Sequence, residues 1–247
     1  MIEFHCINKV IVEKSAKMLR KNGILYRKIE KEDSEALKKF MLENLPKASP
    51  ICRALQFKTG DYEAMYVPRI SESLSSNFSF LAIDDMSGEI VGYHLMSSYH
   101  RDPSKNPPIT LKKTKRAQIL ANISESLRKK FWELSPPEVN FVLRGESSCV
   151  RKEYQRRGIG ETFTQLINNA TKDSGTAGSI SVSTGYSNQK LFEKIGFINL
   201  DEISYKEVFE ANGIPFEGAF EDKTTKAILQ FHPSSKEVRD KFLKAKL

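Results

Sequence analysis

The stretch that decides the fold is YQRRGIGETFTQLINNA, from Tyr154 to Ala170, in which two arginines and two glycines precede a helical pattern. Gly158 and Gly160 allow a tight turn and let the backbone approach a ligand without obstruction by a side chain. The helix that follows presents unpaired amide N–H groups and a partial positive charge, which suits a pyrophosphate. The stretch therefore predicts a phosphate cradle, with Arg156 and Arg157 adding positive charge.

The two glycines also allow simpler interpretations. A glycine turn that only opens a helix, with solvated arginines beside it, is the main alternative. A P-loop is excluded because no Gly-Lys-Ser or Gly-Lys-Thr sequence follows Gly160. The dinucleotide fingerprint is excluded because it needs three glycines in the spacing Gly-x-Gly-x-x-Gly. The surrounding elements have to decide between a cradle and a simple turn.

The rest of the chain alternates between predicted helices and strands. Helices are expected over 8–22, 31–45, 117–134 and 187–195, and strands over 24–29, 78–84, 90–99, 139–150, 179–183, 200–207 and 226–231. Residues 86–88 give a hairpin signal between two of these strands, and Gly145 inside another predicts a β-bulge. The alternation predicts a single α/β layer fold without an interdomain linker.

Composition restricts the class of protein. The chain has 247 residues, of which 39% are hydrophobic and 28% charged, as is typical of a globular protein. The net charge of +8 favours an anionic partner, but the basic residues are dispersed and no nucleic-acid recognition motif accompanies them. The three cysteines show no Cys-x-x-Cys spacing, so neither a disulfide framework nor a metal site is expected. Without an apolar run suited to a membrane span or signal peptide, we expect a cytoplasmic protein with no membrane or nucleic-acid partner.

Two motifs together resemble those of one family. A strand, the residues Gln155-Arg156-Arg157-Gly158-Ile159-Gly160 and a helix resemble motif A of the GCN5-related N-acetyltransferases (GNAT), and NQKLFEKIGF (188–197) resembles the family's LYEKxGF segment. The resemblance implies an α/β fold with a mixed central β-sheet flanked by helices, and a bulged and splayed strand pair that holds acetyl-CoA. It implies an acetyltransferase domain over 24–231, with a helical extension at 1–23 and a C-terminal tail at 232–247.

The same resemblance assigns residues to acetyl-CoA, which is the expected co-substrate. Backbone groups of Ser148, Cys149 and Val150, on the strand before the glycine loop, are expected to bind the pantetheine. The residues expected at the pyrophosphate are Gln155, Arg156, Arg157, Gly158, Ile159, Gly160 and Glu161. Asn188 and Phe192 of the second motif are also expected to contact acetyl-CoA, and no metal is expected.

Glu146 is the candidate general base. Strand alternation places Arg144, Glu146 and Ser148 on one face of their strand. Counted back from Val150, Glu146 resembles the position at which vertebrate arylalkylamine N-acetyltransferases carry a histidine. The alternative is a partly exposed glutamate paired with Arg144. If Glu146 is only structural, Glu43 is the next candidate.

Two segments depart from the family pattern. Phe192 stands where the family usually has the tyrosine that protonates the departing thiolate, so Ser183, Ser187 or water has to replace it. Insect-type arylalkylamine N-acetyltransferases, which the chain resembles in layout, carry serines in this segment; for Ser187 the alternative is a helix N-cap. Those proteins also carry an acidic residue before a proline after the first helix, whereas this chain has Lys47-Ala48-Ser49-Pro50. The missing carboxylate weakens the case for an arylalkylamine acceptor.

These features predict an acetyl-CoA-dependent N-acetyltransferase acting on the primary amine of a small molecule by direct attack on the thioester, with an arylalkylamine as one candidate. Two alternatives stay open: acetylation of protein N-termini or lysines, and a non-catalytic acetyl-CoA-binding module. The loop 101–116 and the segment 46–55 are expected to shape the acceptor pocket, because both are turn-rich and lie near helix ends. A monomer and a homodimer are equally compatible with the sequence.

Overall fold

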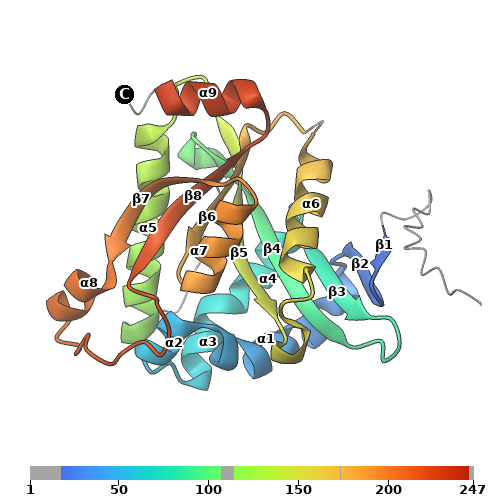
Figure 1. Ribbon diagram of the computed structural model, residues 1–247, viewed down its shortest axis with the longest axis horizontal. Coiled ribbons are helices and arrows are strands. Elements are labelled where there is room, and N and C mark those ends of the chain that lie inside the picture. Colours follow the sequence, from blue (N-terminus) through green and yellow to red (C-terminus); the bar gives the residue numbers. More distant parts are fainter. Residues whose placement is uncertain (1–17, 107–113, 173, 245–247) are drawn as a thin grey trace, which may run out of the picture.

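The computed structural model describes residues 18–106, 114–172 and 174–244, which form an eight-stranded sheet with helices on both faces (Figure 1). The strand order is β1-β2-β3-β4-β5-β6-β8-β7. The strands are β1 (Leu19–Lys21), β2 (Ile24–Lys28), β3 (Phe80–Asp84), β4 (Ile90–His100), β5 (Phe141–Val150), β6 (Gly178–Ser183), β7 (Ile198–Ser204) and β8 (Lys226–Pro233). The helices are α1 (Ser34–Ala48), α2 (Pro50–Ala54), α3 (Thr59–Tyr66), α4 (Pro68–Leu74), α5 (Lys115–Leu134), α6 (Ile159–Thr171), α7 (Tyr186–Lys194), α8 (Tyr205–Ala211) and α9 (Lys236–Lys244). Short 3₁₀ helices are η1 (Lys31–Asp33), η2 (Pro103–Lys105) and η3 (Lys152–Tyr154).

The sheet is mixed, as predicted. Neighbouring strands run antiparallel except β5 and β6, which are parallel and are connected through α6. The predicted hairpin is present as β3 and β4. β5 and β6 pair only at Leu143–Ser179 and Arg144–Ile180, and their backbones then separate. The splayed pair of parallel strands expected from the sequence is therefore confirmed.

The two faces of the sheet carry separate cores. Val142 and Leu143 are neighbours on β5, yet Val142 belongs to the larger core and Leu143 to the smaller one, so the two cores lie on opposite faces. Helices α1, α3 and α5 contribute to the larger core. On the other face, α6 packs Ile159, Phe163 and Ile167 against strands β2 to β5. Figure 1 shows α6 and α7 in front of the sheet and α5 behind it.

Two helices begin where local sequence directs them to begin. Gly158 precedes α6 and has φ 78°, a left-handed conformation that favours glycine. Ser49 caps α2 by accepting a hydrogen bond from the N–H of Cys52, and Pro50 occupies the first helical position.

Because β5 and β6 are parallel, the loops that follow them lie at the same edge of the sheet. Pro50 reaches that edge too, since it packs beside Gly185 after β6.

The helix predicted over 8–22 is wrong at its end. Leu19–Lys21 forms strand β1, which pairs with β2, while residues 8–17 lie outside the described residues. Asn22 and Gly23 have φ of 53° and 73° and connect the two strands as a two-residue turn. Positive φ at both residues is typical of a type I′ hairpin turn, which Asn-Gly favours. Gly23 therefore turns a hairpin and does not end a helix.

Several helices of the structure were not expected from the sequence. Neither α3 nor α4 was expected. The strand predicted over 200–207 ends at Ser204, where α8 begins. Tyr205 and Phe209 are both fully buried and stand four residues apart, which is the spacing of one helical face. α9 follows β8 and buries Phe242 in the larger core.

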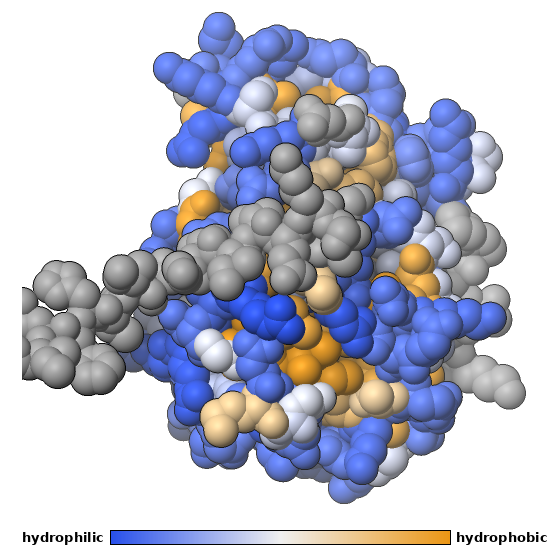
Figure 2. Space-filling model, turned by 90° about the vertical axis from the view of Figure 1, so that its right-hand side faces the viewer, coloured by the Kyte–Doolittle hydropathy of each residue, from blue (hydrophilic) through white to orange (hydrophobic). Residues whose placement is uncertain are grey.

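The surface is mostly polar. On the side of the molecule shown in Figure 2, apolar surface is visible in limited patches between polar side chains. Among the described residues, the exposed large hydrophobic side chains are Met86, on the turn between β3 and β4, and Leu243 on α9. Within 18–106, 114–172 and 174–244, no helix has the length and apolar character that a membrane crossing requires.

Candidate functional site

The loop between β5 and α6 presents a row of free amide groups. Arg156 and Gly158 are left-handed, with φ of 64° and 78°. In the described part of the chain, no group accepts a hydrogen bond from the amide N–H groups of residues 156–161. These amides lie at the N-terminus of α6, where the helix dipole adds a partial positive charge. The arrangement is chemically suited to a pyrophosphate.

Gly160 contributes through packing and does not form the turn itself. It is the second residue of α6 and has no positive φ. A Cβ added at Gly160 would come within 2.8 Å of Cδ2 of Leu191 on α7. Glycine at this position therefore lets α6 and α7 approach closely, whereas the tight turn depends on Gly158.

The side chains predicted to bind phosphates divide into two groups. Nε2 of Gln155 donates to the carbonyl oxygen at the end of β5 at 3.0 Å, and Oε1 of Glu161 accepts from Nζ of Lys194 at 2.6 Å. Arg156 and Arg157 are exposed and form no ion pair within the described residues. The two arginines therefore keep their positive charge available for an anion.

A β-bulge lies next to the point where β5 and β6 separate. Leu95 pairs with Ser147 and Met96 pairs with Gly145, so Glu146 is the extra residue on β5. The bulge predicted at Gly145 is therefore present, displaced by one residue. Past the bulge, no pairing between described residues joins β5 to β6. Side chains bind the carbonyl oxygens of Gly145 and Val150, and the remaining backbone groups on the unpaired edge of β5 can bind another partner.

The bulge changes which side chains share a face of β5. Ser148 pairs with His94, and His94 lines a pocket on the α6 side of the sheet. Ser147 lies on the opposite face, where its Oγ is 2.9 Å from the hydroxyl of Tyr93. The prediction that Ser148 shares a face with Glu146 is wrong, because the extra residue of the bulge shifts the alternation.

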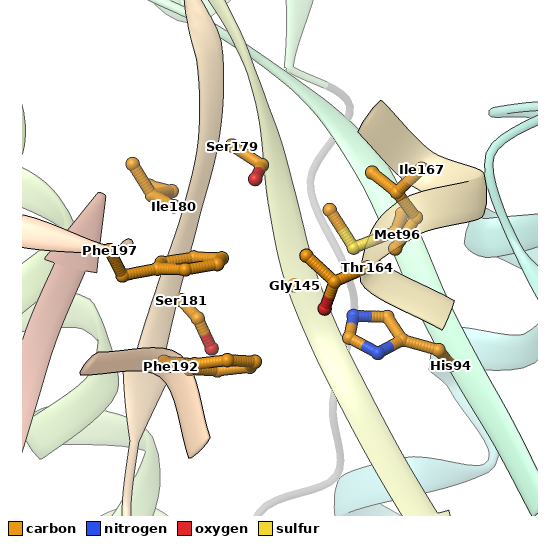
Figure 3. Close-up of a pocket in the computed structure, with 10 residues that line it drawn as sticks. All are labelled: His94, Met96, Gly145, Thr164, Ile167, Ser179, Ile180, Ser181, Phe192 and Phe197. Carbon is orange, nitrogen blue, oxygen red and sulfur yellow. The ribbon is translucent and has the colours of Figure 1, made fainter. Parts of the chain in front are cut away.

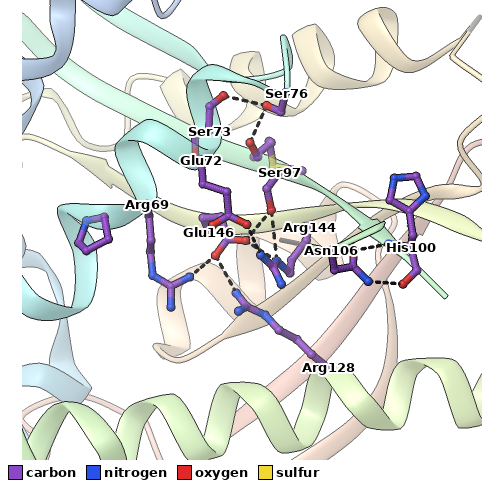
Figure 4. A network of polar contacts seen from close by, with 12 residues as sticks. Arg69, Glu72, Ser73, Ser76, Ser97, His100, Asn106, Arg128, Arg144 and Glu146 are labelled. Atoms are coloured by element: carbon purple, nitrogen blue, oxygen red, sulfur yellow. Dashed lines mark hydrogen bonds and ion pairs between the residues drawn. The ribbon is translucent and has the colours of Figure 1, made fainter. Parts of the chain in front are cut away.

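Glu146 lies among arginines (Figure 4). Its side chain is fully buried. Its carboxylate accepts hydrogen bonds from Arg69 and Arg144, from Nη2 of Arg128 at 3.3 Å and from Oγ of Ser97 at 2.6 Å. Each carboxylate oxygen has two of these partners, which come from α4, α5, β4 and β5. We call this group, together with Glu72, the arginine cage.

The arginine cage fixes the protonation state of Glu146. Burial by itself would raise the pKa of Glu146, but the charges of Arg128, Arg69 and Arg144 and the Ser97 hydroxyl outweigh it and hold the pKa below its usual range. A carboxylate of such low basicity is a weak proton acceptor. The general-base role stays a prediction, and these contacts weigh against it. They favour the alternative, a glutamate paired with arginine. The glutamate is buried with three arginine partners, whereas the alternative expected a partly exposed pair with Arg144 alone.

Glu72 completes the arginine cage. Its Oε1 accepts from Nη2 of Arg144 at 2.7 Å, whereas its Oε2 is buried without a hydrogen-bond partner in the described chain. Burial and the charge of Glu146 raise the pKa of Glu72. When both glutamates are ionised, the three arginines leave the cage with an excess of one positive charge.

A pocket lies on the other face, between α6, α7 and the strands β4, β5 and β6 (Figure 3). It is lined by His94, Met96, Gly145, Thr164, Ile167, Ser179, Ile180, Ser181, Phe192 and Phe197. Phe192 stacks on Phe197 with ring centroids 4.4 Å apart. His94 is 9% exposed and has no hydrogen-bond partner for its side chain in the described chain. Burial lowers the pKa of His94 to about 4, so its imidazole is neutral at physiological pH.

The two predicted serines lie near the end of β6 in different environments. Ser183 is 2% exposed, and its hydroxyl is buried without a partner among the described residues. Ser187 is exposed in the first turn of α7. The N-cap alternative for Ser187 is wrong, because Gly185 holds that position. A Cβ added at Gly185 would lie 3.3 Å from Cδ of Pro50, so the segment 46–55 reaches this end of the splayed strands.

The remaining predicted residues are scattered. Cys149 is buried in the larger core, and Val150 packs against the smaller one. Asn188 is exposed on α7 and Glu43 is exposed on α1. Part of the loop predicted to shape the acceptor pocket, residues 107–113, lies outside the described residues. Among the described residues, no cluster of three or more His, Cys, Asp or Glu side chains could hold a metal ion.

Two kinds of site residue were missed from the sequence. His94 had a signal, a histidine inside the otherwise largely apolar strand IVGYHLMSSY. Arg69 and Arg128 had none, because they stand 77 and 18 residues from Glu146 and reach it only through tertiary packing. Arg69 also belongs to α4, a helix that was not predicted.

Comparisons with known proteins agree with the fold and the motifs. A family model of the acetyltransferase (GNAT) domain matches residues 145–217. No match was found among curated proteins. A solved structure assigned as arylalkylamine N-acetyltransferase 7 of the yellow fever mosquito Aedes aegypti has a TM-score of 0.72 and 16% identity, covering 86% of this chain and 88% of that chain. Arylalkylamine N-acetyltransferase 2 of Aedes aegypti has a TM-score of 0.71 and 17% identity, covering 87% and 100%. A polyamine N-acetyltransferase of Drosophila melanogaster has a TM-score of 0.58 and 13% identity, covering 84% and 98%.

At these identities the solved structures show a shared fold. The domain match covers the bulge, the glycine loop and the second motif, which are the residues that carried the resemblance. The resemblance to the GNAT family is therefore confirmed over residues 145–217 and supports an N-acetyltransferase, and the insect structures share the fold of the chain.

Proposed function

On this acetyltransferase fold, we propose that the chain transfers the acetyl group of acetyl-CoA to the primary amine of a small molecule. One combination of features carries the proposal: a bulged β5 that separates from β6, beside free amides at the N-terminus of α6. The separated β5 offers a strand edge to the pantetheine, and the free amides of α6 offer an anion site to the pyrophosphate. Arylalkylamines are the acceptor class to test first, because two similar structures carry that name.

The glycine loop and β5 divide the binding of acetyl-CoA between them. Amides of residues 156–161 hold the phosphates, and the free charges of Arg156 and Arg157 attract them at longer range. The pantetheine follows the backbone of Ser148 to Val150 toward the bulge. The thioester then reaches the pocket that Phe192 lines.

The reaction needs a neutral amine, since an alkylammonium has a pKa of about 10 if it is lysine-like. The nitrogen lone pair attacks the thioester carbon, the new C–N bond forms, and the C–S bond breaks with its electron pair on sulfur. The attacking nitrogen loses its surplus proton to solvent. Amides that β6 leaves unpaired near the bulge can donate to the thioester oxygen as it gains charge. Holding the amine and the thioester in contact accelerates the reaction further.

Ser183 is the best supported of the predicted proton-transfer groups. Its hydroxyl is buried without a partner, a state that a substrate group or a water would relieve. Glu146 would have to give up contacts with three arginines before it could accept a proton. We therefore propose that Ser183 and water, with Ser187 on the exposed side of the same turn, return a proton to the departing thiolate.

An amine panel tests the proposed function. The purified chain is incubated with acetyl-CoA and, in turn, phenethylamines, tryptamines, polyamines, amino sugars and peptides with a free lysine or N-terminus. Mass spectrometry is expected to show a singly acetylated small amine. Acetylated peptides alone would move the assignment to a protein acetyltransferase. Acetyl-CoA binding without any product would identify a non-catalytic module and contradict the proposal.

A further inference from the structure

His94 is a buried polar side chain that the reaction described above leaves unused. It projects from β4 into the pocket between α6 and α7 (Figure 3). Within the described chain its ring contacts Phe163, with centroids 6.0 Å apart, but forms no hydrogen bond. Neither ring nitrogen is among the fully buried atoms without a partner in the described chain, so the ring is open to a partner that enters the pocket.

The position of His94 indicates what that partner is. Ser148, directly opposite His94, belongs to the strand edge assigned to the pantetheine. Phe192 lies across the same pocket, and Gly145 lies between them at the point where the strands separate. His94 is the one ionisable side chain among the pocket's lining residues. It therefore faces the end of the pantetheine, where the sulfur is.

Besides the hydroxyls of Thr164, Ser179 and Ser181, the one side-chain donor that lines the pocket is His94. A departing thiolate is stabilised when a hydrogen-bond donor faces it. The aromatic residue facing this pocket from α7 is Phe192, which has no hydroxyl to donate. The imidazole of His94 has an N–H in its neutral form.

We propose that His94 is a catalytic residue that donates an N–H hydrogen bond to the thioester sulfur and stabilises the thiolate as it leaves. This inference rests on the proposed function, because it takes acetyl-CoA as the co-substrate. The C–S bond breaks, the electron pair stays on sulfur, and His94 keeps its proton. The nitrogen's proton goes to solvent, and the thiolate then takes a proton from water, directly or relayed by the hydroxyl of Ser183.

The neutral state of the imidazole fits this role. With its pKa lowered to about 4 by burial, His94 carries no charge at neutral pH. Its surroundings are uncharged: the pocket is lined by apolar side chains, hydroxyl groups and a glycine, and Phe163 packs against the ring. A neutral donor needs no counter-ion in such a site, whereas a charged donor would.

Kinetics of a small set of variants test the role of His94. His94→Phe keeps the ring shape and removes the N–H, and should lower kcat by roughly 10- to 100-fold. Acetyl-CoA affinity, measured by calorimetric titration, should change by less than about threefold, a small fraction of the loss expected in kcat. His94→Asn retains a donor and should recover part of kcat. Phe192→Tyr in the His94→Phe background supplies a hydroxyl from the opposite wall and should also recover activity. His100→Phe, the same exchange on the same strand but outside the pocket, is the matched control and should behave as wild type.

A ligand comparison with the wild-type protein keeps the test independent of turnover and of variant folding. The imidazole resonances of His94 should shift on binding CoA and should shift much less on binding desulfo-CoA, which lacks only the sulfur. Equal shifts with both ligands, or a His94→Phe variant that keeps wild-type kcat, would overturn the inference. If the wild-type protein binds CoA but acetylates no amine, the proposed function is wrong. The comparison of CoA with desulfo-CoA would still decide whether His94 contacts the sulfur. Failure to bind CoA at all would overturn both.

Discussion

Replacing Glu146 by glutamine separates a structural role from a catalytic one. Glutamine keeps the size of the side chain but removes the charge that three arginines share. Breaking a buried ion pair by removing one partner typically costs about 3–5 kcal/mol, because uncompensated charge stays buried. In a domain of this size each kcal/mol lowers Tm by about 2–4 °C. Glu146→Gln is therefore expected to lower Tm by roughly 6–20 °C.

Scanning calorimetry and steady-state kinetics below the melting transition measure the two effects. Glu133→Gln is the matched control, because it removes the exposed partner of Lys130, 2.8 Å away, and should leave Tm nearly unchanged. The folded Glu146→Gln variant is expected to keep its pH–rate profile. A general base would be worth about 10²–10⁴-fold in kcat/KM. A variant that melts like the control but loses activity by that factor would refute the structural role of the arginine cage.

The acid side of the stability profile gives a second measurement on Glu146. Its pKa is held lower in the folded protein than in the unfolded chain, where a glutamate has a pKa of about 4.3. The stability it contributes is therefore present above about pH 4.3 and is lost as pH falls toward the folded pKa. Glu146→Gln should lack this component. The raised pKa of Glu72 acts with the opposite sign, because its contribution is present at low pH and lost as pH rises through the folded pKa.

Three further changes probe the rest of the site. Gly158→Val places a β-branched residue at φ 78°, which should cost about 1–3 kcal/mol and weaken acetyl-CoA binding in a calorimetric titration; unchanged affinity in a folded variant would remove the cradle assignment. Arg156→Ala combined with Arg157→Ala should weaken that binding mainly at low salt, and an equal loss at high salt would count against a screened, long-range attraction. Ser183→Ala removes a hydroxyl without a partner, so Tm should stay level or rise while kcat falls; wild-type kcat would end its proposed role.

The parts of the fold that could be predicted are those with short-range signals. Gly158 sits between a strand and an amphipathic helix, and the turn and helix start are where this pattern puts them. Gly145 marked the bulge within one residue. The Asn22-Gly23 signal was present as well but was assigned to a helix end, because apolar residues before it gave a helical pattern that competed with the hairpin turn.

The catalytic environment could not be predicted, because it depends on long-range packing. A one-residue bulge turned Ser148 away from the face of Glu146. Strand alternation counted along the sequence cannot allow for such an inserted residue. The surroundings of Glu146 depend on Arg69 and Arg128, which other elements bring to it. Sequence alternation alone therefore identified Glu146 as a polar residue on the strand but gave the wrong surroundings for it.

Amine-dependent release of CoA decides directly whether the chain is an N-acetyltransferase for small amines. The free thiol is followed with saturating acetyl-CoA, with and without each amine of the panel. We expect CoA release to saturate with at least one small primary amine and to fall to the background rate without it. Release that no amine accelerates, from a protein shown to bind acetyl-CoA, would contradict the assignment of an N-acetyltransferase acting on small amines.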